Sequence, residues 1–271
     1  MKKPPSTENS LCIVIPCYNE EKHFQRARYV HFLDHHPEVL LCFVNDGSTD
    51  RIKDVLEGLR LQFPQQVDVV SYEKNMGKAE AVRRGFIRCY ICHNYIHIAY
   101  LDADLSTSLW ECAGLTAYFE EHIGFVFGSR IMKMGSTIIR SPYRFVVGRI
   151  LASIIGLSLQ LKVYDTQCGC KLFTRELSKT IFENTFTSRW LFDVEIFHRL
   201  IHYYGRERAV HKMVEVPLQQ WIDYGNSKVR PSYFLQLWKD LYKIRKRYKE
   251  PLGSNLTVPA PITTYVQESI T

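Results

Sequence analysis

Short apolar runs recur along the first half of the chain and alternate with segments in which apolar residues return at helical spacing. The apolar runs cover residues 11–15, 40–44, 67–71, 96–101 and 124–128. The helical segments between them cover residues 20–36, 50–62, 76–92 and 108–122. Such alternation is typical of βαβ units, in which parallel strands form one sheet with helices on its faces. We therefore expect an α/β fold whose active site lies outside the carboxyl ends of the strands.

The second half of the chain departs from this regular alternation. Residues 138–161 are largely apolar with Arg140, Arg144 and Arg149 interspersed, and residues 162–171 are polar. Residues 233–248 return to helical spacing, with one apolar and one basic face. The apolar face carries Phe234, Leu237, Trp238, Leu241, Ile244 and Tyr248, and the basic face carries Lys239, Lys243, Lys246 and Arg247. This pattern predicts a basic amphipathic helix on a membrane surface, and a surface helix packed on the core is the alternative.

Length and composition suit one large domain or a domain with an appendage. The chain has 271 residues, of which 46% are hydrophobic and 23% charged, as in ordinary globular proteins. We expect a disordered start at residues 1–10 and one domain at 11–231, which includes an interfacial segment near 138–161. The amphipathic helix at 232–249 and a disordered, proline-containing tail at 250–271 complete the chain.

The charge balance favours anionic partners. A formal net charge of +7 suits phosphates, nucleotides or an anionic membrane surface. The eight cysteines have scattered spacings, which indicates reduced thiols rather than a disulfide framework. Neither a signal peptide nor a run of about 20 apolar residues is visible, so we expect a cytoplasmic protein that associates peripherally with a membrane.

Two carboxylates stand one residue apart where the fourth apolar run ends. Asp102 and Asp104 follow residues 96–101 directly. Like charges at this separation raise each other's pKa unless a cation neutralises them. Mg²⁺ and Mn²⁺ prefer carboxylate oxygens and share them with phosphates. The pair therefore suggests a site for a metal and a nucleotide, although two solvated aspartates in a loop give the same local pattern.

Side chains suited to a nucleotide follow three of the other apolar runs. Tyr18 can stack on a flat base, and Glu20 can accept hydrogen bonds from a ribose or a base. Asp46 can accept from a base N–H, and Lys78 follows a glycine at a helix start, where phosphate can bind. Taken singly, each of these residues fits ordinary turn chemistry equally well.

Taken together, these motifs resemble glycosyltransferase family 2 in their order and spacing, over residues 10–248. The family's fold is the GT-A type, a Rossmann-like, mostly parallel sheet with flanking helices, here with C-terminal amphipathic interfacial helices. Residues 165–173 (DTQCGCKLF) and 189–195 (RWLFDVE) are similar to the corresponding stretches of the polyprenyl-phosphate branch, and most of all to dolichyl-phosphate β-glucosyltransferases.

The resemblance assigns roles to individual residues. Pro16, Tyr18, Glu20 and Asp46 match positions that line the base and ribose, and Lys78 joins this nucleotide-binding set. Asp102 and Asp104 match the motif that holds Mg²⁺ or Mn²⁺ against the diphosphate. Arg130, Arg144 and Lys228 match acceptor-phosphate positions. Asp165 and the Asp193/Glu195 pair lie where the family shapes the acceptor side, so the expected catalytic residues are Asp102, Asp104, Arg130, Asp165 and Asp193.

The sequence also departs from the family pattern. Asn45 stands where a first aspartate is usual, which leaves base recognition to Asp46, and Ala79 stands where a glycine often follows the lysine. Several relatives begin with an anchoring membrane helix, and none is visible here.

The resemblance implies an inverting, metal-dependent hexosyltransferase. The expected reaction transfers glucose from UDP-glucose to dolichyl or another polyprenyl phosphate, at a membrane surface that is the cytosolic face of the endoplasmic reticulum if the source is eukaryotic. Alternatives are another donor such as GDP-mannose, a saccharide acceptor, or a catalytically silent nucleotide-sugar-binding scaffold. A nucleic acid is not among the expected partners, and the oligomeric state stays open.

Overall fold

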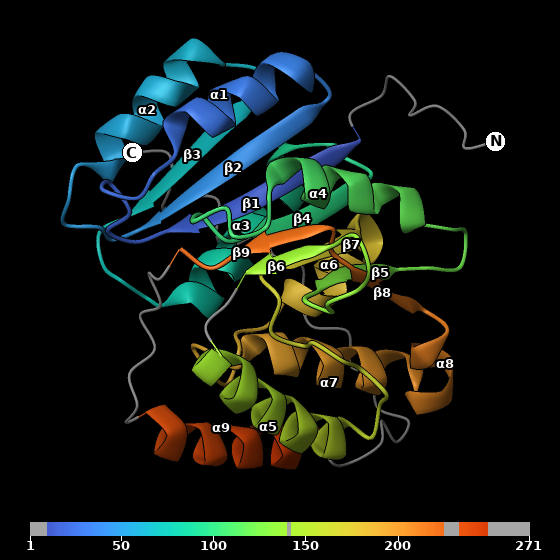
Figure 1. Ribbon diagram of the computed structural model, residues 1–271. Helices are drawn as coiled ribbons and strands as arrows, with labels where there is room; N and C mark the ends of the chain where they lie inside the picture. Colours follow the sequence, from blue (N-terminus) through green and yellow to red (C-terminus); the bar gives the residue numbers. More distant parts are fainter. Residues whose placement is uncertain (1–9, 140–141, 225–232, 249–271) are drawn as a thin grey trace.

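A seven-stranded sheet forms the centre of the computed structural model, which describes residues 10–139, 142–224 and 233–248 (Figure 1). The strand order is β3-β2-β1-β4-β7-β5-β8. The strands are β1 (Leu11–Cys17), β2 (Val39–Asp46), β3 (Val67–Tyr72), β4 (His97–Leu101), β5 (Phe125–Ser129), β7 (Cys170–Thr174) and β8 (Met213–Pro217). β1, β2, β3 and β4 pair in parallel, so their carboxyl ends meet at one edge. The expected α/β fold with a mostly parallel sheet is confirmed.

One strand runs against the others. β7 pairs antiparallel with both β4 and β5, and it therefore joins the first half of the sheet to the β5–β8 pair. A second sheet contains only β6 (Thr137–Ile139) and β9 (Gln220–Ile222). All five strands expected from the apolar runs are present, whereas β7 lies partly in a stretch that reads as polar.

Alternating residues of the strands face two separate cores. Cys12 and Val14 of β1 face α3 (Lys78–Cys92), and the core on this side continues to α6 (Arg175–Phe182) and α7 (Phe192–Tyr204). Leu11, Ile13 and Ile15 face the other side, which is covered by α1 (Arg26–His35), α2 (Ile52–Gln62) and α4 (Leu109–Gly114). This alternation is the period of two that a strand imposes on its side chains.

Two helices are shorter than the sequence pattern predicts. α1 begins at Arg26 rather than near residue 20, because the preceding segment bonds to the start of α2: the Glu21 amide donates to Asp50 Oδ2 at 2.8 Å. The carboxylate of Glu21 accepts from the Arg51 amide at 3.1 Å. The helix expected at 108–122 is α4 followed by a 3₁₀ turn, η1 (Leu115–Tyr118).

A third layer of helices lies beyond α7. α5 (Pro142–Leu159) and α9 (Tyr233–Arg247) both lie below α7 in Figure 1 and each contacts it, and α8 (Arg206–Val210) lies at the end of α7. Within the described residues, no helix has the length and apolar character needed to cross a membrane. The disordered segments expected at 1–10 and 250–271 lie outside the described residues, except for residue 10.

The segment expected to be an amphipathic helix is α9, and only part of its apolar face is buried. Leu237, Leu241 and Ile244 of α9 are buried in the core beside α7, as the surface-helix alternative expects. Trp238 and Tyr242 remain 55% and 68% exposed. The eight cysteines are free thiols, and all but Cys92 are buried.

The packing of α3 on the sheet gives a test of stability. A Cβ on Gly85 would overlap Val14 Cγ1 and lie 2.9 Å from Val44 Cγ2. We expect Gly85→Ala to lower the free energy of unfolding by about 1–3 kcal/mol, because overpacking outweighs the better helix propensity of alanine. Gly58→Ala in α2 is the matched control: nothing lies within 4 Å of its Cβ, and a gain of about 0.5–1 kcal/mol is expected. Urea unfolding measures the free energy of unfolding of both variants. Equal changes in the two variants would contradict the close packing of Gly85 against Val14 and Val44.

Candidate active site

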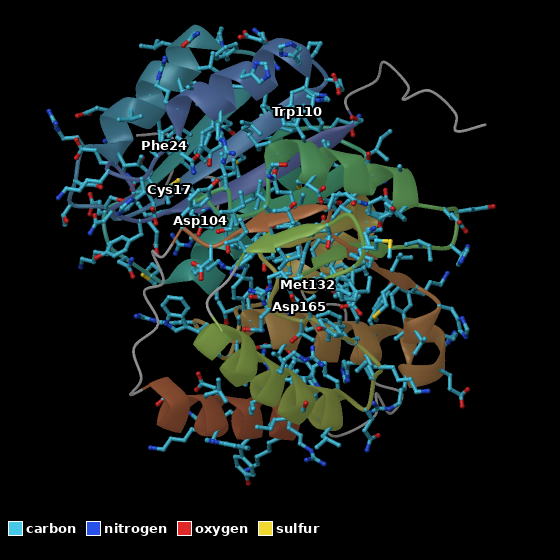
Figure 2. All side chains as sticks on the ribbon, in the orientation of Figure 1. Cys17, Phe24, Asp104, Trp110, Met132 and Asp165 are labelled. Carbon is cyan, nitrogen blue, oxygen red and sulfur yellow. The ribbon has the colours of Figure 1, made fainter. Side chains whose placement is uncertain are left out.

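The carboxyl ends of the parallel strands open into a cavity of about 600 Å³. Apart from Glu195, the predicted site residues whose side chains the structure describes line it: Pro16, Tyr18, Glu20, Asp46, Lys78, Asp102, Asp104, Arg130, Asp165 and Asp193. The side chain of Arg144, on α5, and the whole of Lys228 lie outside the described residues. Figure 2 labels Asp104 at the strand ends and Asp165 between the sheet and the lower helices, so the cavity spans both halves of the chain.

Asp102 and Asp104 follow β4 directly and are held in different ways. Asp102 Oδ1 lies 2.5 Å from Lys78 Nζ, at the first residue of α3. Asp104 Oδ1 accepts a hydrogen bond from the Ser106 amide at 2.9 Å. Burial and the neighbouring charge of Asp102 raise the pKa of Asp104. Burial opposes the charge of Lys78, but Asp102 and Asp193 outweigh it and raise the pKa of the ammonium group. Lys78 therefore offsets part of the repulsion between the two aspartates.

Gly169 brings another part of the chain against Asp102. The Asp102 amide donates to the Gly169 carbonyl at 3.1 Å. A Cβ on Gly169 would overlap the Asp102 carboxylate, with Oδ1 at 2.9 Å. The glycine within residues 165–173 is thus required for close approach of the backbone to the acidic pair.

The acidic pair suits a hard divalent cation that arrives with a diphosphate. Mg²⁺ and Mn²⁺ are often held by one or two carboxylates together with substrate phosphates. Among the described residues, no cluster of three or more His, Cys, Asp or Glu side chains is arranged to hold a metal by itself. Burial, and after it the charge of Asp102, raises the pKa of Asp104, and a cation bound between the two carboxylates would oppose both effects. The residues fit a metal shared with substrate oxygens.

Arg130 and Asp165 form a bidentate ion pair in the cavity wall. Arg130 Nε donates to Asp165 Oδ2 at 2.6 Å, Nη2 donates to Oδ1 at 2.8 Å, and the Arg130 amide also donates to Oδ2 at 3.1 Å. Burial opposes ionisation of Asp165, but Arg130 outweighs it and lowers the pKa of the carboxyl to about 2. The guanidinium also lies 5.2 Å from the centre of the Trp221 ring. Because Arg130 has five N–H donors, the group keeps donors beyond those used by Asp165.

Asp193 anchors a buried lysine under the cavity. Lys171 of β7 is fully buried, and its Nζ donates to Asp193 Oδ1 at 2.7 Å and to the Cys168 carbonyl at 2.6 Å. The Tyr100 hydroxyl donates to the same carboxylate oxygen. A buried charge requires such a partner, which explains how a lysine can occupy a central strand. Glu195, two residues further along α7, does not line the cavity and bonds elsewhere.

The turn after β3 builds the side of the cavity where the sequence predicts nucleotide binding. Asp46 accepts from the amides of Met76 and Gly77, both at 2.8 Å. The backbone of Gly77 has φ of 95°, a conformation that residues other than glycine rarely adopt. Asp46 therefore orders the turn that presents Lys78, in addition to lining the cavity.

The cavity lining also includes charged and aromatic residues that the sequence motifs left unassigned, among them Arg149, Arg189 and Trp190. Arg149 of α5 donates to the Tyr164 carbonyl at 3.1 Å and lies 3.8 Å from the centre of that residue's ring. Arg189 packs beside Gly77, and Trp190 follows it in the lining. The similarity of residues 189–195 to the family was the available signal for Arg189 and Trp190, and no sequence signal singled out Arg149.

Comparison with known proteins agrees with this arrangement. The sequence model described as Glycosyl transferase family 2 matches residues 12–182. A dolichyl-phosphate beta-glucosyltransferase of Trichomonas vaginalis is 32% identical over 247 residues, covering 85% of this chain and 69% of the relative. The enzymes of that name from Drosophila melanogaster and Homo sapiens are 28% and 27% identical, over 90% of this chain and 78% and 77% of their own lengths.

Solved structures share the fold at low identity. Mannosyl-3-phosphoglycerate synthase of Rubrobacter xylanophilus has a TM-score of 0.61 at 14% identity, covering 93% of this chain and 78% of that one. A mannosyltransferase of Pyrobaculum calidifontis, in complex with GDP-Man and Mn²⁺, has a TM-score of 0.57 at 14% identity and covers 93% and 69%. These likenesses establish a GT-A fold, and with the match over residues 12–182 they show that the chain belongs to glycosyl transferase family 2.

Proposed function

We propose that this protein transfers glucose from UDP-glucose to dolichyl phosphate and inverts the anomeric carbon. The observation that carries the proposal is that one cavity is lined by the Asp102–Asp104 pair and by two cationic side chains, Lys78, which pairs with Asp102, and Arg130. A donor diphosphate and an acceptor phosphate repel each other, so a transferase for both needs positive charge on both sides. The relatives named dolichyl-phosphate beta-glucosyltransferases support the choice of sugar and lipid.

The donor would lie along the strand ends. Tyr18, Pro16 and Glu20 line the cavity at the end of β1, where a base and ribose can be received. Lys78 stands at the first residue of α3, so both its charge and the helix N-terminus favour the diphosphate. Asp102 and Asp104 would hold Mg²⁺ or Mn²⁺, and the bound metal would stabilise the leaving diphosphate as a Lewis acid. A Mn²⁺ complex of the Pyrobaculum calidifontis structure supports this choice of cofactor.

The acceptor needs neutralisation more than it needs a base. A phosphate monoester has a second pKa near about 6, so its attacking oxygen is already anionic at neutral pH. The donors of Arg130 that Asp165 leaves open can bind that phosphate, and Asp165 holds the guanidinium in position. Arg144 and Lys228 remain predicted partners of the same phosphate. A single displacement by this oxygen turns an α-linked donor into a β-linked lipid-phosphate sugar.

The lower helices would seat the enzyme on the cytosolic face of the endoplasmic reticulum. The outer face of α9 exposes Lys239, Lys243, Trp238 and Tyr242, which suits anionic headgroups and their boundary with the acyl chains. Leu157 of α5, in the same layer, is 78% exposed. A polyprenyl tail could then stay in the bilayer while its phosphate enters the cavity.

A panel of substrates tests the proposed reaction. Purified protein with Mg²⁺ or Mn²⁺ is assayed with UDP-glucose, GDP-mannose and UDP-N-acetylglucosamine against dolichyl and undecaprenyl phosphate. A labelled, lipid-extractable product from UDP-glucose with β configuration is expected. A product from GDP-mannose alone would select the alternative donor, and no product from any pair would favour a silent nucleotide-sugar-binding scaffold.

Removal of one carboxylate tests the metal site. We expect Asp104→Ala to reduce transfer at least about a thousandfold, since it removes a group that stabilises charge in the transition state, while the thermal midpoint changes little. Mn²⁺ binding in the presence of UDP, measured by calorimetry, should weaken in parallel. Full transfer activity in this variant would show that the metal assignment is wrong.

The contact between Gly169 and Asp102 gives a second test. Gly169→Ala should displace the Asp102 carboxylate and lower kcat/KM by about 100-fold, because a shift of about 1 Å in a positioned group has effects of that size. Gly114→Ala is the control, because nothing lies within 4 Å of its Cβ, and its activity should match that of the unaltered protein. Equal kinetics for the two variants would contradict the proposed role of the close approach.

Charge reversal on α9 tests membrane seating. Lys239→Glu combined with Lys243→Glu should reduce co-sedimentation with phosphatidylserine vesicles by about tenfold or more, since each basic residue near such a surface contributes about 1 kcal/mol. Lys53→Glu with Arg60→Glu on the opposite side of the molecule makes the same change in net charge. Similar binding by both double variants would show that α9 is not the docking element.

A further inference from the structure

The one acidic residue of α9 points into the protein. Residues 233–247 contain one acidic residue, Asp240. The basic residues in the same range are Lys239, Lys243, Arg245, Lys246 and Arg247. Asp240 is only 6% exposed, whereas the neighbouring Lys239 is exposed. Burial of a carboxylate is costly unless hydrogen bonds compensate it. The inward carboxylate therefore calls for a specific partner.

That partner is the turn before α7. The Ser188 hydroxyl donates to Asp240 Oδ2 at 2.7 Å, and Gln236 Nε2 donates to Oδ1 at 2.8 Å. The Ser188 oxygen accepts in turn from the amides of Leu191 at 3.0 Å and Trp190 at 3.3 Å. A hydroxyl that gives its proton to a carboxylate keeps both lone pairs for such amides. Asp240 thus fixes the direction in which Ser188 holds the turn.

The same turn forms a wall of the cavity. Arg189 and Trp190 line it, and the Arg189 carbonyl accepts from the Ala79 amide at 3.3 Å. Ala79 directly follows Lys78, whose ammonium group pairs with Asp102. The contacts therefore run without interruption from Asp240 to the donor side of the site.

A second attachment joins α9 to the same segment. Glu195 is fully buried; its Oε2 accepts from the Thr187 amide at 2.7 Å, and its Oε1 accepts from the Tyr248 hydroxyl at 2.9 Å. Arg247 Nη1 donates to Thr187 Oγ1 at 3.1 Å. Residues 187 and 188 are consequently held to α9 from two points, so this segment follows the position of α9.

We propose that Asp240 is a positioning residue, which acts through Ser188 to hold Arg189 and Trp190 in place for the nucleotide-sugar diphosphate. The role of these two residues toward that substrate rests on the function proposed above. Attachment of α9 alone does not require the carboxylate, since Leu237, Leu241 and Ile244 already bury an apolar face. Apolar packing already holds α9 against the protein, and the hydrogen bond between Ser188 and Asp240 additionally fixes how α9 is oriented relative to the turn before α7.

Four variants test the proposal: Asp240→Ala, Asp240→Asn, Ser188→Ala and, as a control at an exposed position of α2 away from the cavity, Lys53→Ala. Asp240→Ala and Ser188→Ala should raise the hydrogen-exchange rates of the 190 and 191 amides about tenfold, the effect of one lost hydrogen bond. They should raise KM for UDP-glucose about tenfold and change kcat less than about twofold. Asp240→Asn keeps an acceptor oxygen and should restore both quantities to within about threefold, and Lys53→Ala should leave them unchanged.

The opposite pattern overturns the proposal. If Asp240→Ala lowers the thermal midpoint but leaves the exchange of the two amides and the KM of the folded enzyme unchanged, Asp240 only supports the fold. If the unaltered protein transfers no sugar from any donor, the proposed function fails instead. The exchange rates and the affinity for UDP, measured by calorimetry, then decide the positioning role without reference to turnover.

Discussion

The mutual repulsion of Asp102 and Asp104 is the constraint around which the rest of the molecule is arranged. The fold places both carboxylates at the end of a buried parallel strand, where burial raises the pKa of Asp104. Lys78 supplies a cation from the start of α3, and Asp46 orders the turn that delivers it. Gly169 lets a second part of the chain close over Asp102 without a clash. Each device comes from a different strand end, so the site exists only when the sheet is complete.

Sequence periodicity was sufficient for the parallel part of the fold and insufficient for its middle. β1, β2, β4 and β5 are largely apolar runs because both of their faces are buried, and such runs are visible without a structure. β7 was missed because it contains Lys171, whose charge is neutralised by Asp193 from α7. The apolar and polar pattern around Lys171 does not reveal that Asp193, 22 residues further along the chain, neutralises its charge. The start of α1 was misplaced for a similar reason, since Glu21 bonds to the turn after β2 instead of continuing a helix.

The site was predictable in its membership and less so in its contacts. The family-like motifs named ten residues that line one cavity, because strand ends in a parallel sheet converge. They did not indicate that the carboxylate of Asp165 accepts two hydrogen bonds from the Arg130 guanidinium group, or that Asp46 accepts hydrogen bonds from backbone amides. Such pairings depend on side-chain directions across the sheet. Arg149 was noted among the arginines of residues 138–161 but was given no role, because the family resemblance extended only to Arg144 of the same helix.

The antiparallel β7 has a consequence for how the chain is made. During synthesis the segment through β5 emerges first, and it contains β4 and β5 without the strand that joins them. Both strands then present unpaired backbone edges, which attract other chains. Long-range pairing of this kind also slows folding. The newly made protein therefore passes through a stage in which it is vulnerable to aggregation, and this stage ends only when the second half of the chain supplies β7.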